Sequence, residues 1–219
     1  GSGTTTLGGK LLTITNGSTT FSGAMNGTSG QLTISGGTET LSGNNGYTGA
    51  TIINSSATLA LTGSGAIASS SSVAANGTFD ISGTTSGASI KALTGNTSGV
   101  VALGSQTLTL SSAGTSTFSG VIKDAGLTAG TGGNLTLTTG TEILSGINTY
   151  TGTTTINGGT LELNNTSGTT LPTTAAVTIS GSGTLDLHDY SQTIASMNST
   201  STSSVITNNG SANNVTLSI

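Results

Sequence analysis

The sequence predicts an all-β protein, a β-solenoid of roughly ten coils in which short parallel strands stack along one axis. Three observations predict this fold: apolar residues recur in pairs two positions apart, clusters of Gly, Asn and Ser separate the pairs, and long stretches of sequence occur twice. Large aromatic residues, which usually fill sandwich and propeller cores, are scarce, with 3 Phe, 3 Tyr and no Trp in 219 residues. A narrow interior of stacked Leu, Ile and Val fits this composition better. At about 20 residues per coil, a typical solenoid repeat size, the chain makes about ten coils.

The apolar pairs mark the expected strands. Two apolar residues separated by one residue, often Thr, have the period of a strand with one buried face. Thr is β-branched and suits the outward position of such a strand. In chain order the pairs are Leu12/Ile14, Leu32/Ile34, Leu59/Leu61, Phe79/Ile81, Leu108/Leu110, Leu135/Leu137, Leu161/Leu163, Val177/Ile179, Leu185/Leu187 and Val215/Leu217. We expect these side chains to line the core and the residues between them to form Thr and Asn ladders on the surface.

Corners between the strands are predicted where Gly, Asn and Ser cluster. Examples are Asn26-Gly27, Ser35-Gly-Gly37, Asn157-Gly-Gly159 and Ser180-Gly-Ser-Gly183. Glycine adopts positive φ at low cost, so these clusters allow the chain to change direction. No segment has a convincing helical pattern.

A nine-residue motif occurs twice and fixes the organisation of the chain. Leu41-Ser-Gly-Asn-Asn-Gly-Tyr-Thr-Gly49 and Leu144-Ser-Gly-Ile-Asn-Thr-Tyr-Thr-Gly152 agree at seven of nine positions with an offset of 103. The same offset relates residues 31–34 to 134–137 and Glu39 to Glu142. Such repeats indicate an elongated array. We therefore predict one continuous solenoid over residues 1–219, built of two tandem copies, about 12–107 and 108–214, with a third repeat phase starting at residue 215.

The charge composition excludes several partners. The chain has 3 Lys+Arg against 7 Asp+Glu, a net charge of −4, and its three lysines, Lys10, Lys91 and Lys123, are scattered. Without a basic patch, the surface has no cluster of positive charge to attract the phosphates of nucleic acid or anionic lipid. We therefore exclude both as partners. No apolar run approaches the roughly 20 residues of a membrane-spanning helix, so direct membrane insertion is not expected.

The few residues able to carry chemistry are isolated in the sequence. His188, the only histidine, and Asp186 share one side of a strand, where a metal or acid/base site is conceivable. Such a site normally needs three convergent ligands, so the expected arrangement is a solvated outer face running into a turn at Asp189. Glu39 and Glu142 belong to different repeats and should lie too far apart for glycoside hydrolysis, which uses carboxylates about 5 to 9.5 Å apart.

We therefore assign no catalytic residue, no cofactor and no metal, and predict that the protein is not an enzyme. A hydrolase would instead lose activity when His188 is replaced by Ala. Tyr47 and Tyr150, in the nine-residue motif, could be exposed platforms for stacking sugars, or could pack over a corner with the hydroxyl in water. Tyr47, Tyr150 and His188 are the candidate surface ligand contacts.

Several segments resemble a known family. These are Phe118-Ser-Gly-Val-Ile122, Asn134-Leu-Thr-Leu137, Leu144-Ser-Gly-Ile-Asn-Thr-Tyr-Thr-Gly152, Thr155-Ile-Asn-Gly-Gly-Thr-Leu-Glu-Leu163 and Gly183-Thr-Leu-Asp-Leu187. They are similar to the autotransporter-associated β-strand repeat of Gram-negative bacterial passenger domains. The resemblance implies a right-handed parallel β-helix at the extracellular or outer-membrane surface, and a downstream β-barrel translocator in the parent chain.

The resemblance and the uncharged composition together favour a non-enzymatic stalk or adhesin that acts in adhesion, aggregation or biofilm. Its partners would be other copies of itself or surface molecules of host or neighbouring cells. The alternative is a structural subunit of an extracellular fibre that polymerises by end-to-end stacking of solenoids. The second copy is longer around Lys123 to Gly133, and no function is assigned to that segment.

Overall fold

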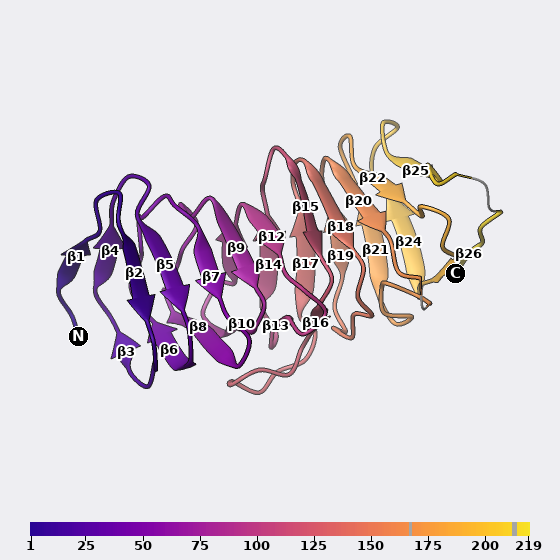
Figure 1. Cartoon of the computed structure of the whole chain (residues 1–219). Coiled ribbons are helices and arrows are strands. Elements are labelled where there is room, and N and C mark those ends of the chain that lie inside the picture. Colours follow the sequence, from indigo (N-terminus) through magenta and orange to yellow (C-terminus); the bar gives the residue numbers. More distant parts are fainter. Residues whose placement is uncertain (167, 212–213) are drawn as a thin grey trace.

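The computed structural model describes residues 1–166, 168–211 and 214–219, and these residues form strands, turns and loops but no helix. No membrane-crossing helix was found in this described part of the chain. The strands stack from one end of an elongated body to the other, and the two termini lie at opposite ends (Figure 1). Neighbouring strands pair in parallel, as predicted. The all-β solenoid is therefore confirmed.

The strands form three faces, which we call faces A, B and C. Face A begins with one five-stranded sheet and continues into a second one, the two joined by a bridge between Gly95 and Phe118. Its strands are β2 (Leu11–Ile14), β5 (Gln31–Ile34), β7 (Thr51–Ile53), β9 (Ser72–Ala75), β12 (Ala92–Thr94), β15 (Thr115–Phe118), β18 (Thr141–Leu144), β20 (Thr160–Leu163), β22 (Thr184–Asp186) and β25 (Val205–Thr207). One strand per coil gives about ten coils, as expected.

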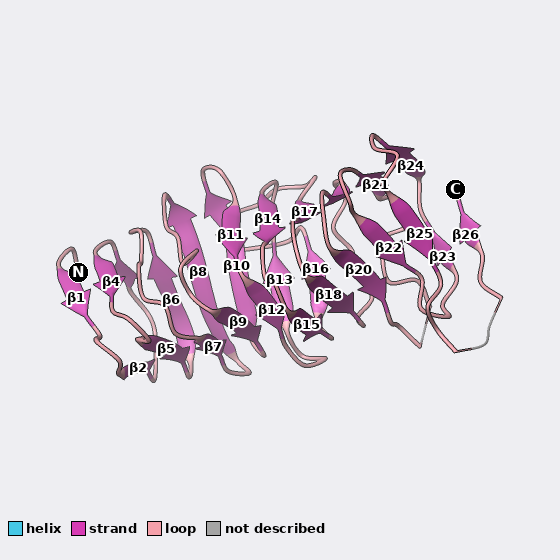
Figure 2. Cartoon of the chain, turned by 90° about the horizontal axis from the view of Figure 1, so that it is seen from above, coloured by secondary structure: helices cyan, strands magenta, loops and turns pink. Residues whose placement is uncertain are grey.

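Faces B and C complete each coil. Face B consists of β3 (Thr20–Phe21), β6 (Gly37–Leu41), β8 (Ala57–Gly63), β10 (Thr78–Thr84), β13 (Val100–Ala102) and β16 (Val121–Lys123), and ends with β23 (Gln192–Thr193) and β26 (Leu217–Ser218). Face C consists of β1 (Thr4–Thr6), β4 (Ala24–Asn26), β11 (Ala88–Ile90), β14 (Thr107–Leu110), β17 (Asn134–Leu137), β19 (Thr154–Ile156), β21 (Ala176–Ile179) and β24 (Ser196–Ser199). The chain visits faces C, A and B in that order, and Figure 2 shows the stack from a second direction.

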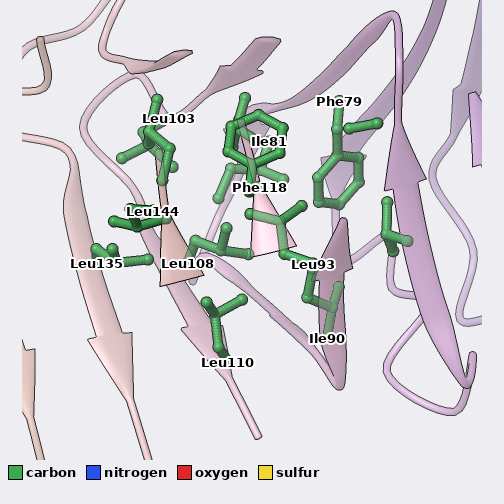
Figure 3. Packing of buried hydrophobic residues seen from close by; sticks show 14 of the residues in the cluster. Phe79, Ile81, Ile90, Leu93, Leu103, Leu108, Leu110, Phe118, Leu135 and Leu144 are labelled. Carbon is green, nitrogen blue, oxygen red and sulfur yellow. The ribbon is translucent and has the colours of Figure 1, made fainter. Parts of the chain in front are cut away.

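The core is one column of apolar side chains that runs along the inside of the stack. Predicted pairs such as Phe79/Ile81 and Leu108/Leu110 are buried, and Figure 3 shows them packed with residues of the neighbouring coils. Only the two terminal pairs, in β2 and beyond residue 214, are partly exposed. Full burial of one such side chain is worth about 1.5–3 kcal/mol, so a continuous column accounts for stability without disulfides or large aromatic clusters.

Glycines make the tight corners that the sequence indicates. Gly37 and its counterpart Gly140 have φ values of 69° and 75°. A Cβ atom at either position would lie 2.1 Å from a backbone oxygen of the adjacent coil. These corners therefore require glycine for its backbone conformation and for the close approach of the neighbouring coil.

The two copies of the repeat are rotated relative to each other by one face. β5 lies on face A, but its sequence counterpart β17 lies on face C; β6 lies on face B, but its counterpart β18 lies on face A. On face A, β18 is five coils beyond β5, and β17 precedes β18 by one face. An offset of 103 residues therefore advances the chain by five coils less one face. As a result, equivalent residues of the two copies lie on different faces and point in different directions around the axis.

Candidate functional site

The nine-residue motif forms a buried corner whose asparagine joins three coils. Asn148 is 3 % exposed, and its Oδ1 accepts the Ile122 N–H of the preceding coil at 2.8 Å. Its Nδ2 donates to the Thr170 carbonyl of the following coil at 3.0 Å. Asn45 makes the same bonds to the coils on either side of it. The motif thus satisfies buried backbone groups of β4 and β16, each of which is the last strand of its sheet.

The tyrosines of the motif fill the interior of the same corner. Tyr47 and Tyr150 have no exposed area. The Tyr47 hydroxyl lies 2.7 Å from Thr51 Oγ1, and Tyr150 forms the same hydrogen bond with Thr154. Burial raises the pKa of Tyr47 to about 12 and raises that of Tyr150 further.

The prediction of surface ligand contacts at Tyr47 and Tyr150 is therefore wrong, and so is the expectation that their hydroxyls are wet. The corner is wide enough to take a whole ring, and a threonine four residues later supplies the buried hydroxyl with a partner. The recurrence of that threonine in both copies, at Thr51 and Thr154, is the sequence signal for an inward tyrosine.

Two glutamates point into the core. Glu142 is 1 % exposed and Glu39 is 5 % exposed. Each lies two residues before an inward leucine, Leu144 or Leu41, and this alternation predicts their direction. Loss of water raises the pKa of Glu142 to about 8, although a hydrogen bond from Ser116 Oγ opposes the rise; burial also raises the pKa of Glu39. The two carboxyl groups lie on different faces several coils apart, so they do not form a catalytic pair.

Residues 124–133, which we call the flap, explain the extra length of the second copy. The flap follows β16 and returns across β13 to β10, below the strands in Figure 1. There the N–H of Leu127 donates to Asp80 Oδ2 at 2.6 Å, and the N–H of Thr128 donates to Ser82 Oγ at 2.9 Å. Asp80 is 2 % exposed, because the flap covers it.

A second aspartate closes the base of the flap. Asp124 accepts the N–H groups of Gly132 and Gly133 at 3.1 Å each, and the Thr151 hydroxyl at 2.6 Å. These charge-assisted bonds tie both ends of the flap to the solenoid body. A hollow of about 280 Å³ remains beneath it, lined in part by Asp80 and Lys123.

In the structure, His188 lies next to Glu162 and Asp186 on face A. Glu162 on β20 and Asp186 on β22 are register partners on adjacent coils. His188 Nδ1 lies 3.5 Å from Glu162 Oε1, and one ligand atom of each residue lies within 4.8 Å of the other two. His188 and Asp189 form the predicted turn, with positive φ at both.

The expectation of a solvated outer face around His188 is wrong for its neighbours. Asp186 is 3 % exposed, and the Glu162 side chain is 15 % exposed. The covering comes from the next coil, where Asn209 Nδ2 donates to Asp186 Oδ2 at 3.0 Å. Reasoning from sequence missed Glu162, because its proximity depends on the register between β20 and β22.

Outward threonines form straight rows, as the expected ladders require. On face C, Thr109, Thr136, Thr155 and Thr178 are successive register partners. On face A, the corresponding row is Thr115, Thr141, Thr160 and Thr184. The face C strands from β14 to β24 contain no Asp, Glu, Lys or Arg. Face C therefore presents an uncharged surface of hydroxyl and amide groups over five coils.

The family model of the passenger-associated-transport-repeat matches the chain twice, over residues 36–61 and 139–163. These segments span β6, β7 and most of β8, and β18 to β20, with the corner glycine, the inward glutamate, and the buried Asn and Tyr. The chain thus carries two copies of this repeat, which associates it with autotransporter passengers and confirms the resemblance. Neither the search of curated proteins nor that of solved structures found a match. The corner glycines and the buried Asn and Tyr of these segments serve the stacking of coils.

Proposed function

We propose that this chain is a segment of the exported passenger of an autotransporter-like protein, and that it acts at the outer-membrane or extracellular surface as a self-adhesive stalk. The uncharged part of face C carries this proposal. Its threonine row repeats at every coil without a charged side chain in the strands. Surfaces with little charge repel each other weakly, so two such faces can associate side by side through hydroxyl and amide hydrogen bonds.

The proposed role is structural rather than catalytic. Asn148 and Tyr150 are the polar residues of the nine-residue motif that could have bound a ligand. Their side chains instead form hydrogen bonds inside the stack, and those of Asn148 join neighbouring coils. The inward Glu142 shares its site with Ser116 and apolar neighbours. This use of polar side chains supports a rigid spacer whose outer surface, and not a cleft, meets the partner.

A second candidate function is a fibre built by end-to-end stacking. It would use the apolar side chains of the terminal coils of this chain, where Leu11 is 55 % exposed and Ile206 is 42 % exposed. A hollow of about 300 Å³ opens beside Leu12 and Phe21, and another of about 340 Å³ lies beside Met197. A strand of another copy could pair with either terminal coil.

Side-by-side adhesion predicts that cells displaying the chain clump, and that Thr136→Lys combined with Thr178→Lys abolishes most of the clumping. The two positions lie on one row of face C, separated by one coil, so the added charges make the facing surfaces repel. Thr136→Ser with Thr178→Ser keeps the hydroxyls and should clump like the parent. Sedimentation of displaying cells measures this; equal clumping of the lysine variant would contradict face C adhesion.

Electron microscopy of the purified chain over a range of concentrations separates the two functions. Adhesion through face C gives short single stacks or side-by-side pairs. End-to-end filaments that grow with concentration, and that persist in the lysine variant, would establish the fibre instead.

A further inference from the structure

We propose that Glu162, Asp186 and His188 form a binding site for a divalent transition metal ion, with Zn²⁺ as the occupant. The inference is independent of the adhesive role. The three side chains offer two carboxylate oxygens and one imidazole nitrogen, all within 4.8 Å of one another. This mixed N and O donor set suits zinc and its neighbours in the first transition row better than Ca²⁺ or Mg²⁺, which prefer oxygen alone.

The site has an electrostatic reason to hold a cation. Glu162 and Asp186 face the same way on adjacent coils, so two carboxylates are stacked at strand spacing. Like charges directly opposite each other in a sheet are destabilising. No lysine lies beside them in the register, where Asp186 is followed by Thr207. A divalent ion would neutralise both carboxylates in one step.

The imidazole supplies a second and independent observation. His188 Nδ1 is shielded from water yet has no hydrogen-bond partner, although it lies 3.5 Å from Glu162 Oε1. A buried polar atom without a partner is uncommon and requires an explanation. An ion bound between the two atoms provides one, because Nδ1 would then donate its lone pair to the metal.

The ligands have support behind them. Asp186 Oδ1 accepts the backbone N–H groups of His188 and Asn209, each at 3.0 Å, and Asp186 Oδ2 accepts Asn209 Nδ2 at 3.0 Å. Each carboxylate oxygen has two lone pairs, so capacity remains for a metal. Hydrogen bonds of this kind to a ligating carboxylate fix its orientation and strengthen metal binding.

The first copy of the repeat provides an internal comparison. Asp80 corresponds to Asp186 and accepts the N–H of the residue two positions later, Ser82, at 2.9 Å, as Asp186 does with His188. Its other oxygen is taken by the flap, and the position equivalent to Glu162 is Ala60. The same aspartate thus anchors a loop in one copy, and meets a histidine and a glutamate in the other.

The site is closed around Asp186 and reaches solvent at His188, whose side chain is 35 % exposed. A hollow of about 430 Å³, lined by His188, Tyr190 and Asn209 among others, lies beside that histidine. With three protein ligands, a fourth position would be left for water, as in open zinc sites. The ion would link β20, β22 and the turn after β22 into one unit.

Zinc titration with the full chain tests the proposal, because His188 is the single histidine and its ring gives unambiguous NMR signals. We expect one Zn²⁺ per chain in calorimetry, with a shift of the His188 ring resonances at the same stoichiometry. Glu162→Gln should weaken binding by about tenfold or more, and His188→Asn, which also tolerates positive φ, should abolish it. Asp80→Asn, which alters the equivalent aspartate of the first copy, should leave zinc affinity unchanged.

Circular dichroism would first establish that each variant is folded, and only folded variants would be compared in affinity. Ca²⁺ at the same concentrations should leave the His188 ring unshifted. The proposal is overturned if zinc leaves the His188 resonances unchanged. It is also overturned if folded Glu162→Gln binds zinc as tightly as the parent, or if folded Asp80→Asn loses zinc affinity.

Discussion

Replacing Glu142 by Gln is expected to stabilise the protein at neutral and alkaline pH and to have little effect in acid. Burial raises the pKa of Glu142 from its ordinary value of 4.5 to about 8. Below the lower value the carboxyl is protonated in both the folded and the unfolded chain. Between the two values only the unfolded chain releases the proton, so rising pH favours unfolding by about 1.4 kcal/mol per pH unit. At pH 7 this amounts to about 3 kcal/mol, which Gln, being neutral, does not incur.

Urea unfolding of the parent and of Glu142→Gln between pH 4 and pH 9 measures this effect. The free energies of unfolding should be similar at pH 4, diverge as pH rises through the window, and stay separated above the folded-state pKa. The Ser116 hydroxyl can donate to Gln as it does to Glu142, so the packing is kept. A difference between the two proteins that is the same at every pH would show that Glu142 is ionised in the core or exposed to water.

Replacing Asn148 by Ala is expected to lower the free energy of unfolding by about 2 kcal/mol. The change removes the side-chain bonds to Ile122 and Thr170 and leaves the buried Ile122 N–H without a partner, whereas the Thr170 carbonyl keeps the backbone N–H of residue 148. Each unsatisfied buried group costs about 1–3 kcal/mol, and Ala restores none of that. Because Asn148 joins three coils, the loss should also loosen the coils on both sides of the corner.

Urea unfolding with hydrogen exchange measures both effects. Asn45→Ala should give a loss of similar size in the first copy, since Asn45 makes equivalent bonds. Asn16→Ala serves as the control, because Asn16 is exposed and its loss should change stability by less than about 0.5 kcal/mol. If Asn148→Ala is as mild as the control, the motif does not hold neighbouring coils together.

Local patterns in the sequence determine much of this fold. The spacing of Leu135 and Leu137 gives a strand with one buried face, and the glycine clusters give corners such as that at Gly37. These features need only the geometry of a few adjacent residues. The rotation between the copies could not be predicted in the same way, because it depends on the exact number of residues in each intervening coil.

The polar interior was harder to predict than the apolar one. From the sequence, Tyr150 is either an exposed platform for sugars or a ring packed over a corner with its hydroxyl in water, but Thr154 satisfies that hydroxyl in the interior. The meeting of Glu162 with His188 requires the register between two coils, which the spacing of residues within one strand does not contain. In a solenoid, the environment of a side chain is set by residues about one coil away.

Disulfide formation between introduced cysteines tests the stacked parallel coils most directly, because the chain has no cysteine of its own. Thr136 and Thr155 are outward register partners on adjacent coils of face C, whereas Thr178 lies one coil further on. Strands stack about 4.8 Å apart, within the range a disulfide bridges, and two steps exceed it. The account predicts rapid oxidation of the Thr136→Cys/Thr155→Cys pair and none of Thr136→Cys/Thr178→Cys within one chain. Failure of the first pair, or equal oxidation of both, would contradict it.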